Sequence, residues 1–259
     1  MLIDSHCHLN MLDLADFDQD LAQVMKQASA ADVSHMLTVC VKLSDLPQIM
    51  AIVERFPNVF SSVGVHPNET DEVDAAKLIS LATHSTCIAI GETGLDYYRT
   101  EEAAAKEVQC ENFRQHIQAS LSLEKPLIIH TRQASEDTLR IMAEEKAGEI
   151  GGVMHCFSED WDVAKRALDM NFYISFSGIV TFKSATMLQD VAKKVPADRI
   201  LIETDSPYLA PVPFRGKQNH PALVKHVATV LSVLRDVDES VIAAQTTENF
   251  YHCFRVKKS

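Results

Sequence analysis

The sequence predicts an α/β fold, a (β/α)8 TIM barrel with an extra C-terminal helix. Short apolar runs alternate with amphipathic helical segments along nearly the whole chain of 259 residues. Histidine and acidic side chains gather where several of the apolar runs end. Parallel strands that are covered by helices are apolar on both faces, and the carboxyl ends of barrel strands meet at one face.

Eight apolar runs are the strand candidates, and several are apolar at consecutive positions. They cover residues 2–9, 35–41, 59–65, 87–91, 126–130, 151–157, 172–180 and 199–204. Eight strands alternating with helices over ~250 residues are typical of this barrel. A doubly wound open sheet is the structural alternative. No Gly-x-Gly-x-x-Gly follows the first run, which disfavours a dinucleotide-binding version of that sheet.

Helical stripes follow seven of the runs, with apolar residues spaced three and four apart. The stripes start at Leu21, Leu46, Phe113, Leu139, Trp161, Met187 and Val224. Ser135 and Ser158 stand where helix N-caps are expected. A last helix, at about residues 238–254, has no strand after it. We expect this helix to pack on the exterior of the barrel.

The composition favours one large globular domain that covers residues 1–259. The chain is 46% hydrophobic, which suffices for a sizeable core, and no linker or low-complexity tract divides it. No apolar run reaches the ~18 residues of a membrane span, and no basic segment precedes an apolar leader. We therefore expect a cytoplasmic protein with no membrane partner and no obligate protein partner.

The net charge and the cysteine pattern exclude some classes of function. The net charge of −12 argues against a broad nucleic-acid-binding surface, while leaving room for a local anion site. The six cysteines form no Cys-x-x-Cys motif, and most sit in or beside apolar runs, as reduced buried thiols do.

The first run ends in His6 and His8, two residues apart and so on one side of a strand. Two imidazoles that converge from one rigid element suit a transition metal, and two hydrogen-bonded structural histidines are the alternative. Further candidates end later runs. Together, the residues that would converge from six strands are His6, His8, His66, Glu92, His130, His155 and Asp205. Such a set at the carboxyl face of a barrel indicates an active site.

Basic residues also follow the strands, although the chain is acidic overall. They are Arg99, Arg132, Lys183, Arg215 and Lys217. One interpretation is a rim that holds phosphate groups around a metal centre, and the other is scattered solvated charge.

These stretches resemble the TatD-family metal-dependent deoxyribonucleases of the amidohydrolase superfamily. The matching stretches are Asp4-Ser-His-Cys-His8, Gly64-Val-His-Pro67, Gly91-Glu-Thr-Gly-Leu-Asp-Tyr97, His130-Thr-Arg132, His155-Cys-Phe157, Glu203-Thr-Asp-Ser-Pro-Tyr208, Pro213-Phe-Arg-Gly-Lys-Gln-Asn219 and Thr247-Glu-Asn-Phe250. They span nearly the whole chain in the family's order. Gln133 follows Arg132 at the position where many relatives have the aspartate of a His-x-Arg-Asp pattern. This difference concerns a residue that would contact a metal ligand, and the metal ligands themselves are unchanged.

The resemblance implies two divalent metal ions per chain. His6, His8 and Asp205 would hold one ion, His130 and His155 the other, and Glu92 would bridge them. A bridging carboxylate suits two ions ~3.5–4 Å apart, and a hydroxide between them would be the nucleophile. Glu92 and Asp205 are therefore the expected catalytic residues, since Asp205 could also take a proton from the attacking water. The metal identity stays open, because four imidazoles favour zinc, manganese or iron while family members are typically described as magnesium-supported.

Other side chains would serve around the metals. His66, Arg132, Arg215 and Lys217 are the expected substrate-binding residues. Glu203 alternates with Asp205 along the eighth run, so it would support a ligand from behind or pair with a cation. Asp96 is expected in a loop, with a turn role and a catalytic role both open.

The resemblance implies a phosphodiesterase that acts on DNA as a 3′–5′ exonuclease at single-stranded ends. A small-molecule amidohydrolase or esterase is the alternative enzyme, because the same hydroxide attacks a carbonyl. A metal-dependent binding or scaffold barrel is the non-enzyme alternative. Missing ligands would indicate such a scaffold, and all six are present.

Overall fold

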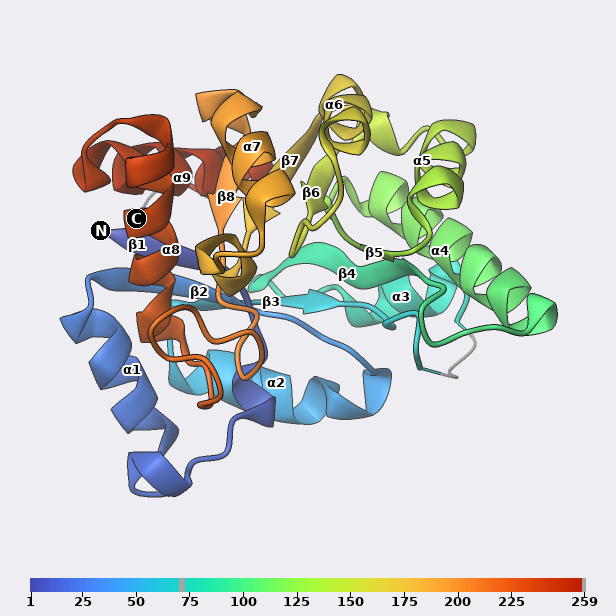
Figure 1. The fold of residues 1–259 in the computed structure, drawn as a ribbon. Coiled ribbons are helices and arrows are strands. Elements are labelled where there is room, and N and C mark those ends of the chain that lie inside the picture. The colour runs from blue at the N-terminus through green and yellow to red at the C-terminus, as the bar shows by residue number, and fades with distance from the viewer. Residues whose placement is uncertain (70–72, 258–259) are drawn as a thin grey trace.

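The computed structural model describes residues 1–69 and 73–257, and it contains the predicted barrel (Figure 1). The strands are β1 (Leu2–Cys7), β2 (Val33–Thr38), β3 (Val59–Val63), β4 (Cys87–Asp96), β5 (Leu127–Arg132), β6 (Gly152–Met154), β7 (Phe172–Phe176) and β8 (Ile200–Ile202). They pair in parallel and in chain order, β1 to β8. This architecture confirms the (β/α)8 prediction.

The α-helices lie outside the strands (Figure 1). They are α1 (Leu21–Ala30), α2 (Leu46–Arg55), α3 (Ala75–Leu81), α4 (Ala103–Leu123), α5 (Ser135–Glu144), α6 (Trp161–Asp169), α7 (Thr186–Lys194), α8 (Val224–Arg235) and α9 (Glu239–Phe254). In the part of the chain that the structure describes, no helix is long and apolar enough to cross a membrane.

The two predicted N-caps were wrong, and one helix has no counterpart in the predictions. Ser135 is the first residue of α5, and α6 begins after Asp160, whose side chain accepts from the Val163 amide. The short helix α3 was not predicted, because it has one buried apolar residue, Leu78, instead of a stripe. Its N-cap Asp74 accepts a hydrogen bond from the Lys77 amide, the usual local signal for a helix start.

Alternate residues of the strands face two separate cores. In β5, Leu127 and Ile129 pack with the surrounding helices, whereas Ile128 between them belongs to a smaller cluster inside the barrel. Side chains of α9, among them Phe250 and Phe254, complete this inner cluster. The last helix thus lies outside the strands, as predicted, but its aromatic side chains also reach into the core within the barrel.

The barrel closes where β8 meets β1, and few backbone contacts join this seam. An isolated parallel bridge links Cys7 with Ser206. The amide of Asp205 donates to the carbonyl oxygen of His6 at 2.9 Å, and the amide of His8 donates to that of Ser206 at 2.7 Å. Residues from the start and the end of the barrel are thereby held side by side.

Candidate metal centre

The structure brings the six predicted metal-binding side chains together at the carboxyl ends of the strands. Five of them line a cavity of about 640 Å³, and His6 lies buried beside it. The five are His8, Glu92, His130, His155 and Asp205. His66 and Arg132 line the same cavity.

The first group consists of His6, His8 and Asp205. The Nε2 atoms of His6 and His8 lie 3.3 Å apart, and Asp205 Oδ1 lies 3.7 Å and 3.4 Å from them. His8 Nδ1 lies 3.1 Å from the carbonyl oxygen of Val39, which can only accept, so Nδ1 carries the proton. The Nε2 lone pair of His8 therefore faces the group and is available to a metal ion.

Glu92 lies at the centre of the donor set. Its Oε2 is 3.4 Å from His6 Nε2, while its Oε1 is 2.8 Å from His155 Nε2 and 3.2 Å from His130 Nδ1. The two oxygens of one carboxylate thus face two different sets of imidazoles. This arrangement suits a ligand shared by two ions.

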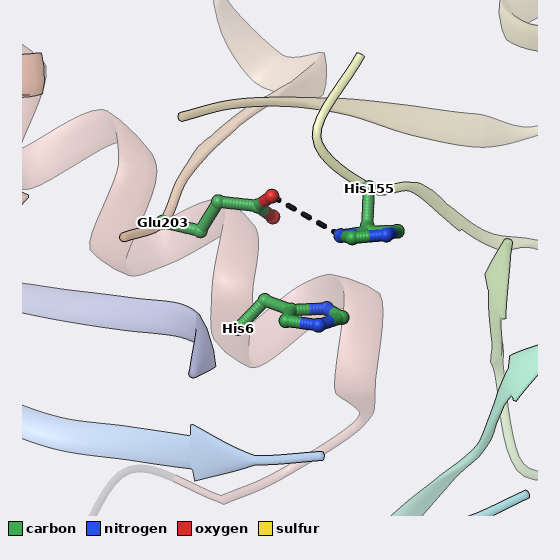
Figure 2. A group of neighbouring side chains, drawn as sticks. All are labelled: His6, His155 and Glu203. Carbon is green, nitrogen blue, oxygen red and sulfur yellow. Dashed lines mark hydrogen bonds and ion pairs between the residues drawn. The ribbon is translucent and has the colours of Figure 1, made fainter. Parts of the chain in front are cut away.

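Glu203 supports His155 from behind (Figure 2). His155 Nδ1 donates to Glu203 Oε1 at 3.2 Å, and the amide of Cys156 donates to the same oxygen at 2.7 Å. A carboxylate that accepts a hydrogen bond from Nδ1–H keeps the proton on that nitrogen and leaves the Nε2 lone pair free to bind a metal. The His155 ring also stacks on His6, with ring centres 3.9 Å apart, which connects the two groups.

Asp96 holds His130 in the same way, from within β4 and not from a loop as the sequence suggested. Its Oδ2 lies 3.3 Å from His130 Nε2 and accepts from Asn68 Nδ2 at 2.9 Å. His130 Nδ1 is then the nitrogen that faces Glu92. Close packing of β4 on β5 fixes this register, since a Cβ added at Gly94 would lie 2.0 Å from the His130 carbonyl oxygen.

His66 is arranged as a hydrogen-bond donor. The amide of Asn68 donates to His66 Nδ1 at 3.1 Å, so the neutral ring carries its proton on Nε2. That nitrogen lies 3.4 Å from Glu92 Oε1. Burial lowers the pKa of His66 to about 4, which keeps the ring neutral at physiological pH. With Glu92 and His130 it forms a group whose possible ligand atoms lie within 4.8 Å.

The electrostatics of the centre favour a bound cation. Burial alone would lower the pKa of His155, but the carboxylates of Glu92 and Glu203 outweigh burial and raise it. Burial would raise the pKa of Glu92, but the surrounding imidazoles, above all His155, hold it well below its ordinary value. Glu92 thus stays ionised, and its negative charge favours a positive charge beside it.

Buried polar atoms without hydrogen-bond partners also fit a metal ion. Within the described residues they include His6 Nδ1, His155 Nε2 and Glu203 Oε2. His155 Nε2 lies 2.8 Å from Glu92 Oε1 without the geometry of a hydrogen bond. A nitrogen and a carboxylate oxygen that face each other in this way without a hydrogen bond are typical of two ligands of one cation. The residues present therefore fit divalent metal binding.

Only some of the basic residues that were predicted to form a rim lie beside this centre. Arg132 and Arg99 line the cavity, whereas Arg215 and Lys217 are not among its lining residues in the described chain. The Arg215 guanidinium carbon instead lies 4.2 Å from the centre of the Phe182 ring.

Sequence reasoning gave no role to Asp4, although it lies two residues before His6. Asp4 is fully buried and accepts from the amide and the hydroxyl of Thr204 at 2.8 and 2.6 Å. A carboxylate just before the His-x-His pair was a visible signal, but its partner lies on another strand.

Comparisons with known proteins agree with this geometry. The profile of the family described as "TatD related DNase" matches residues 3–255. The chain is 48% identical to the "Uncharacterized metal-dependent hydrolase YcfH" of Escherichia coli K12, covering 100% of this chain and 97% of that protein. It is 40% identical to the "Uncharacterized metal-dependent hydrolase YabD" of Bacillus subtilis, covering 99% of this chain and 100% of that protein.

A solved structure shares the fold. The crystal structure of YjjV, a TatD homologue from Escherichia coli, superposes with a TM-score of 0.88 at 24% identity, covering 99% of this chain and 98% of that one. The profile match and the curated relatives establish that the chain belongs to the TatD-related DNase family of metal-dependent hydrolases.

Proposed function

We propose that this chain is a two-metal phosphodiesterase that acts on DNA as a 3′–5′ exonuclease at single-stranded ends. The observation that carries the proposal is the position of Glu92, whose two oxygens face separate imidazole groups at the base of one cavity. The family description as a DNase supports a nucleic-acid substrate.

The proposed ligands divide into two sets that share Glu92. His6, His8 and Asp205 would hold one divalent ion, and His130 and His155 the other. When bound, two such ions supply Lewis acidity at the phosphoryl group and lower the pKa of water. The ions would be zinc, manganese or magnesium, and assays of protein refilled with each metal distinguish the three.

The chain's own residues would then position and move protons. Burial would raise the pKa of Asp205, but the neighbouring imidazoles of His8, His6 and His155 outweigh burial and lower it, so an ionised carboxylate is ready to accept a proton from water. His66 would donate from Nε2 to a phosphoryl oxygen. Glu203 and Asp96 would fix the tautomers of His155 and His130, which keeps one ring nitrogen of each free.

A small-molecule hydrolase is the second candidate. The cavity of about 640 Å³ has the size of pockets that enclose small ligands, ≈ 300–1,000 Å³. An amidohydrolase or esterase would use the same donor set on a carbonyl group.

One experiment compares the two candidates directly. Protein that has been chelated and refilled with one defined metal is assayed on an end-labelled oligonucleotide and on a panel of esters and amides. We expect phosphodiester cleavage with near two ions bound per chain. Preferred turnover of esters or amides would overturn the nuclease proposal, and no bound metal would overturn both.

Two variants test the ligand roles. Glu92→Gln should lose both ions and activity, because the neutral amide no longer holds two cations together. Asp205→Asn should lower kcat while the ion at His130 and His155 remains. Asp190→Asn, on the outer helix α7, is the matched control and should behave as wild type. Near-wild-type kcat in Asp205→Asn would remove Asp205 from the mechanism.

A further inference from the structure

The cavity above the metal donors has two chemically different walls. Arg99, just past β4, and Arg132, the last residue of β5, lie on one side. Met11, Tyr208 and Leu209, which follow β1 and β8, line the other. In an eight-stranded barrel with strands in chain order, β4 and β5 lie across from β8 and β1. The metal donors therefore lie between a cationic wall and an apolar, aromatic wall.

The two arginines are free to bind an external anion. Within the described residues, neither Arg99 nor Arg132 forms an ion pair, whereas Arg114, Arg140 and Arg166 on the outer helices all pair with carboxylates. Both are exposed, in a chain whose net charge is −12. Arginines without an ion pair beside an acidic site indicate that an anion from outside the protein binds there.

The Arg132 side chain is also oriented. Its guanidinium carbon lies 3.8 Å from the centre of the Tyr98 ring, a stacking distance. Stacking on an aromatic face holds the planar guanidinium so that its N–H groups can grip a phosphate with two parallel hydrogen bonds.

The opposite wall offers an exposed aromatic ring close to the metal donors. Tyr208 is 54% exposed, although it is a large side chain, and its ring centre lies 6.2 Å from that of His8. Its hydroxyl donates to the Met11 sulfur at 4.0 Å, a weak hydrogen bond. An aromatic face of this kind is suited to stacking with a nucleobase.

We propose that Arg99 and Arg132 bind the phosphate next to the scissile phosphate, and that Tyr208 stacks on the base of the nucleotide being removed. The assignment rests on the proposed nuclease function and adds the subsites to it. When the nucleic-acid backbone binds one wall and the terminal base stacks on the other, that base cannot be paired with a complementary strand. The walls thus select a single-stranded or splayed end, and a paired terminus is a poorer substrate.

This assignment moves the flanking-phosphate site away from the residues that the sequence suggested. Arg215 and Lys217 are not among the described residues that line the cavity, and the Arg215 guanidinium stacks on Phe182. Arg215→Ala is therefore a matched control, since it removes an exposed arginine that lies outside this lining and forms no ion pair with another described residue.

The test uses two single-stranded oligonucleotides that differ at one linkage. In one, the phosphate next to the scissile position is replaced by an uncharged methylphosphonate. Loss of a charge-assisted contact should raise the KM of wild type and of Arg215→Ala for the methylphosphonate strand about tenfold or more. Arg99→Ala and Arg132→Ala should raise KM for the unmodified strand and should show little further increase with the methylphosphonate. Arg132→Lys should recover only part of the loss, because Lys cannot form the paired hydrogen bonds.

Binding of the same strands, measured by fluorescence anisotropy, separates this proposal from the proposed function. Discrimination against the methylphosphonate that persists in both arginine variants would overturn the subsite, even if the enzyme cleaves DNA. No cleavage of any oligonucleotide or of bis(p-nitrophenyl) phosphate would overturn the nuclease function, whatever the binding data show. Tyr208→Ser should weaken binding of single strands more than binding of blunt duplexes, and an equal effect on both would contradict the stacking role.

Discussion

At the residue scale, the position of Asp205 depends on buried side chains that are not proposed metal ligands. Asp205 has a φ of 57°, in the left-handed region that non-glycine residues seldom occupy. Asp4 accepts two hydrogen bonds from the preceding Thr204, while Asn219 donates to the carbonyl oxygens of Thr204 and Tyr208. These bonds fix the backbone on both sides of Asp205 and so direct its carboxylate toward His8.

Asp4→Ala should therefore damage both stability and one metal site. The amide of Thr204 would lose its partner, which costs about 1–3 kcal/mol for a buried group. Denaturant unfolding of metal-free protein should show this loss, and calorimetric metal titration should show weaker binding at the site of His6 and Asp205. Asp4→Asn, which keeps one acceptor oxygen, should lie between. Unchanged metal affinity in Asp4→Ala would mean that Asp205 is positioned without it.

The buried ring of His116 should make the free energy of unfolding decrease in acid. It is buried, its Nε2 accepts from the Val65 amide at 3.0 Å, and burial lowers its pKa from 6.5 to about 4. Between these values the unfolded chain binds a proton that the folded chain does not, so stability falls as pH decreases from 6.5 to about 4. The full effect is about 3 kcal/mol at one pKa unit per 1.36 kcal/mol.

Unfolding of chelated protein at pH 7 and pH 5 measures this dependence. His116→Gln removes the titrating ring and should flatten the pH dependence relative to wild type, whatever its stability at pH 7. An identical slope in both proteins would assign the acid sensitivity to other groups.

At the element scale, the strand ends were easier to predict than the elements that support them. The donors were visible because polar side chains interrupt apolar runs at His130, His155 and Asp205. The predicted strand at residues 87–91 is too short, because Glu92 and Gly94 are typical of a loop, whereas β4 continues to Asp96. Burial and pairing with β5 keep those polar residues in the strand, and a single sequence does not reveal that pairing.

Long-range partners could not be predicted for the same reason. The contact between Asp4 and Thr204 spans 200 residues and exists only once β8 lies beside β1. Chain position also suggested Arg215 for the substrate site, whereas the path of the loop after β8 places its guanidinium on Phe182. Periodicity identified α9, but not that Phe250 and Phe254 enter the barrel.

The helix α9 should contribute much of the stability of the inner core. Phe250 is fully buried, so Phe250→Ala should cost about 3–5 kcal/mol. Val233→Ala on α8, where the side chain is 77% exposed, is the control and should change stability by less than about 0.5 kcal/mol. Denaturant unfolding measures both. A loss below about 1 kcal/mol in Phe250→Ala would contradict a core role for this helix.

At the scale of the whole molecule, the proposed ligands come from five strands, so bound metal should stabilise the entire barrel. A ligand at 100 times its Kd stabilises the folded state by ≈ 2.7 kcal/mol per site. For a chain of this size, one such site should raise Tm by about 5–10 °C.

Differential scanning calorimetry of chelated and refilled protein tests this effect. The increase in Tm should be smaller in His6→Ala and close to wild type in Asp190→Asn. One transition is expected, because the sequence predicts that residues 1–259 form a single domain. An equal Tm with and without metal would contradict the linkage, and two transitions would contradict the single domain.

Under the proposed function, activity requires both β1 and β8, and these two strands are made at different times during protein synthesis. Ribosomes make the chain from its N-terminus, so His6 and His8 emerge long before Asp205. A nascent chain that ends before β8 has no Asp205 and no Thr204 to hold it, and its barrel has no closing strand. Under the proposed function, an unfinished chain is therefore harmless to DNA, and the enzyme becomes active only after its last strand has been made and has paired.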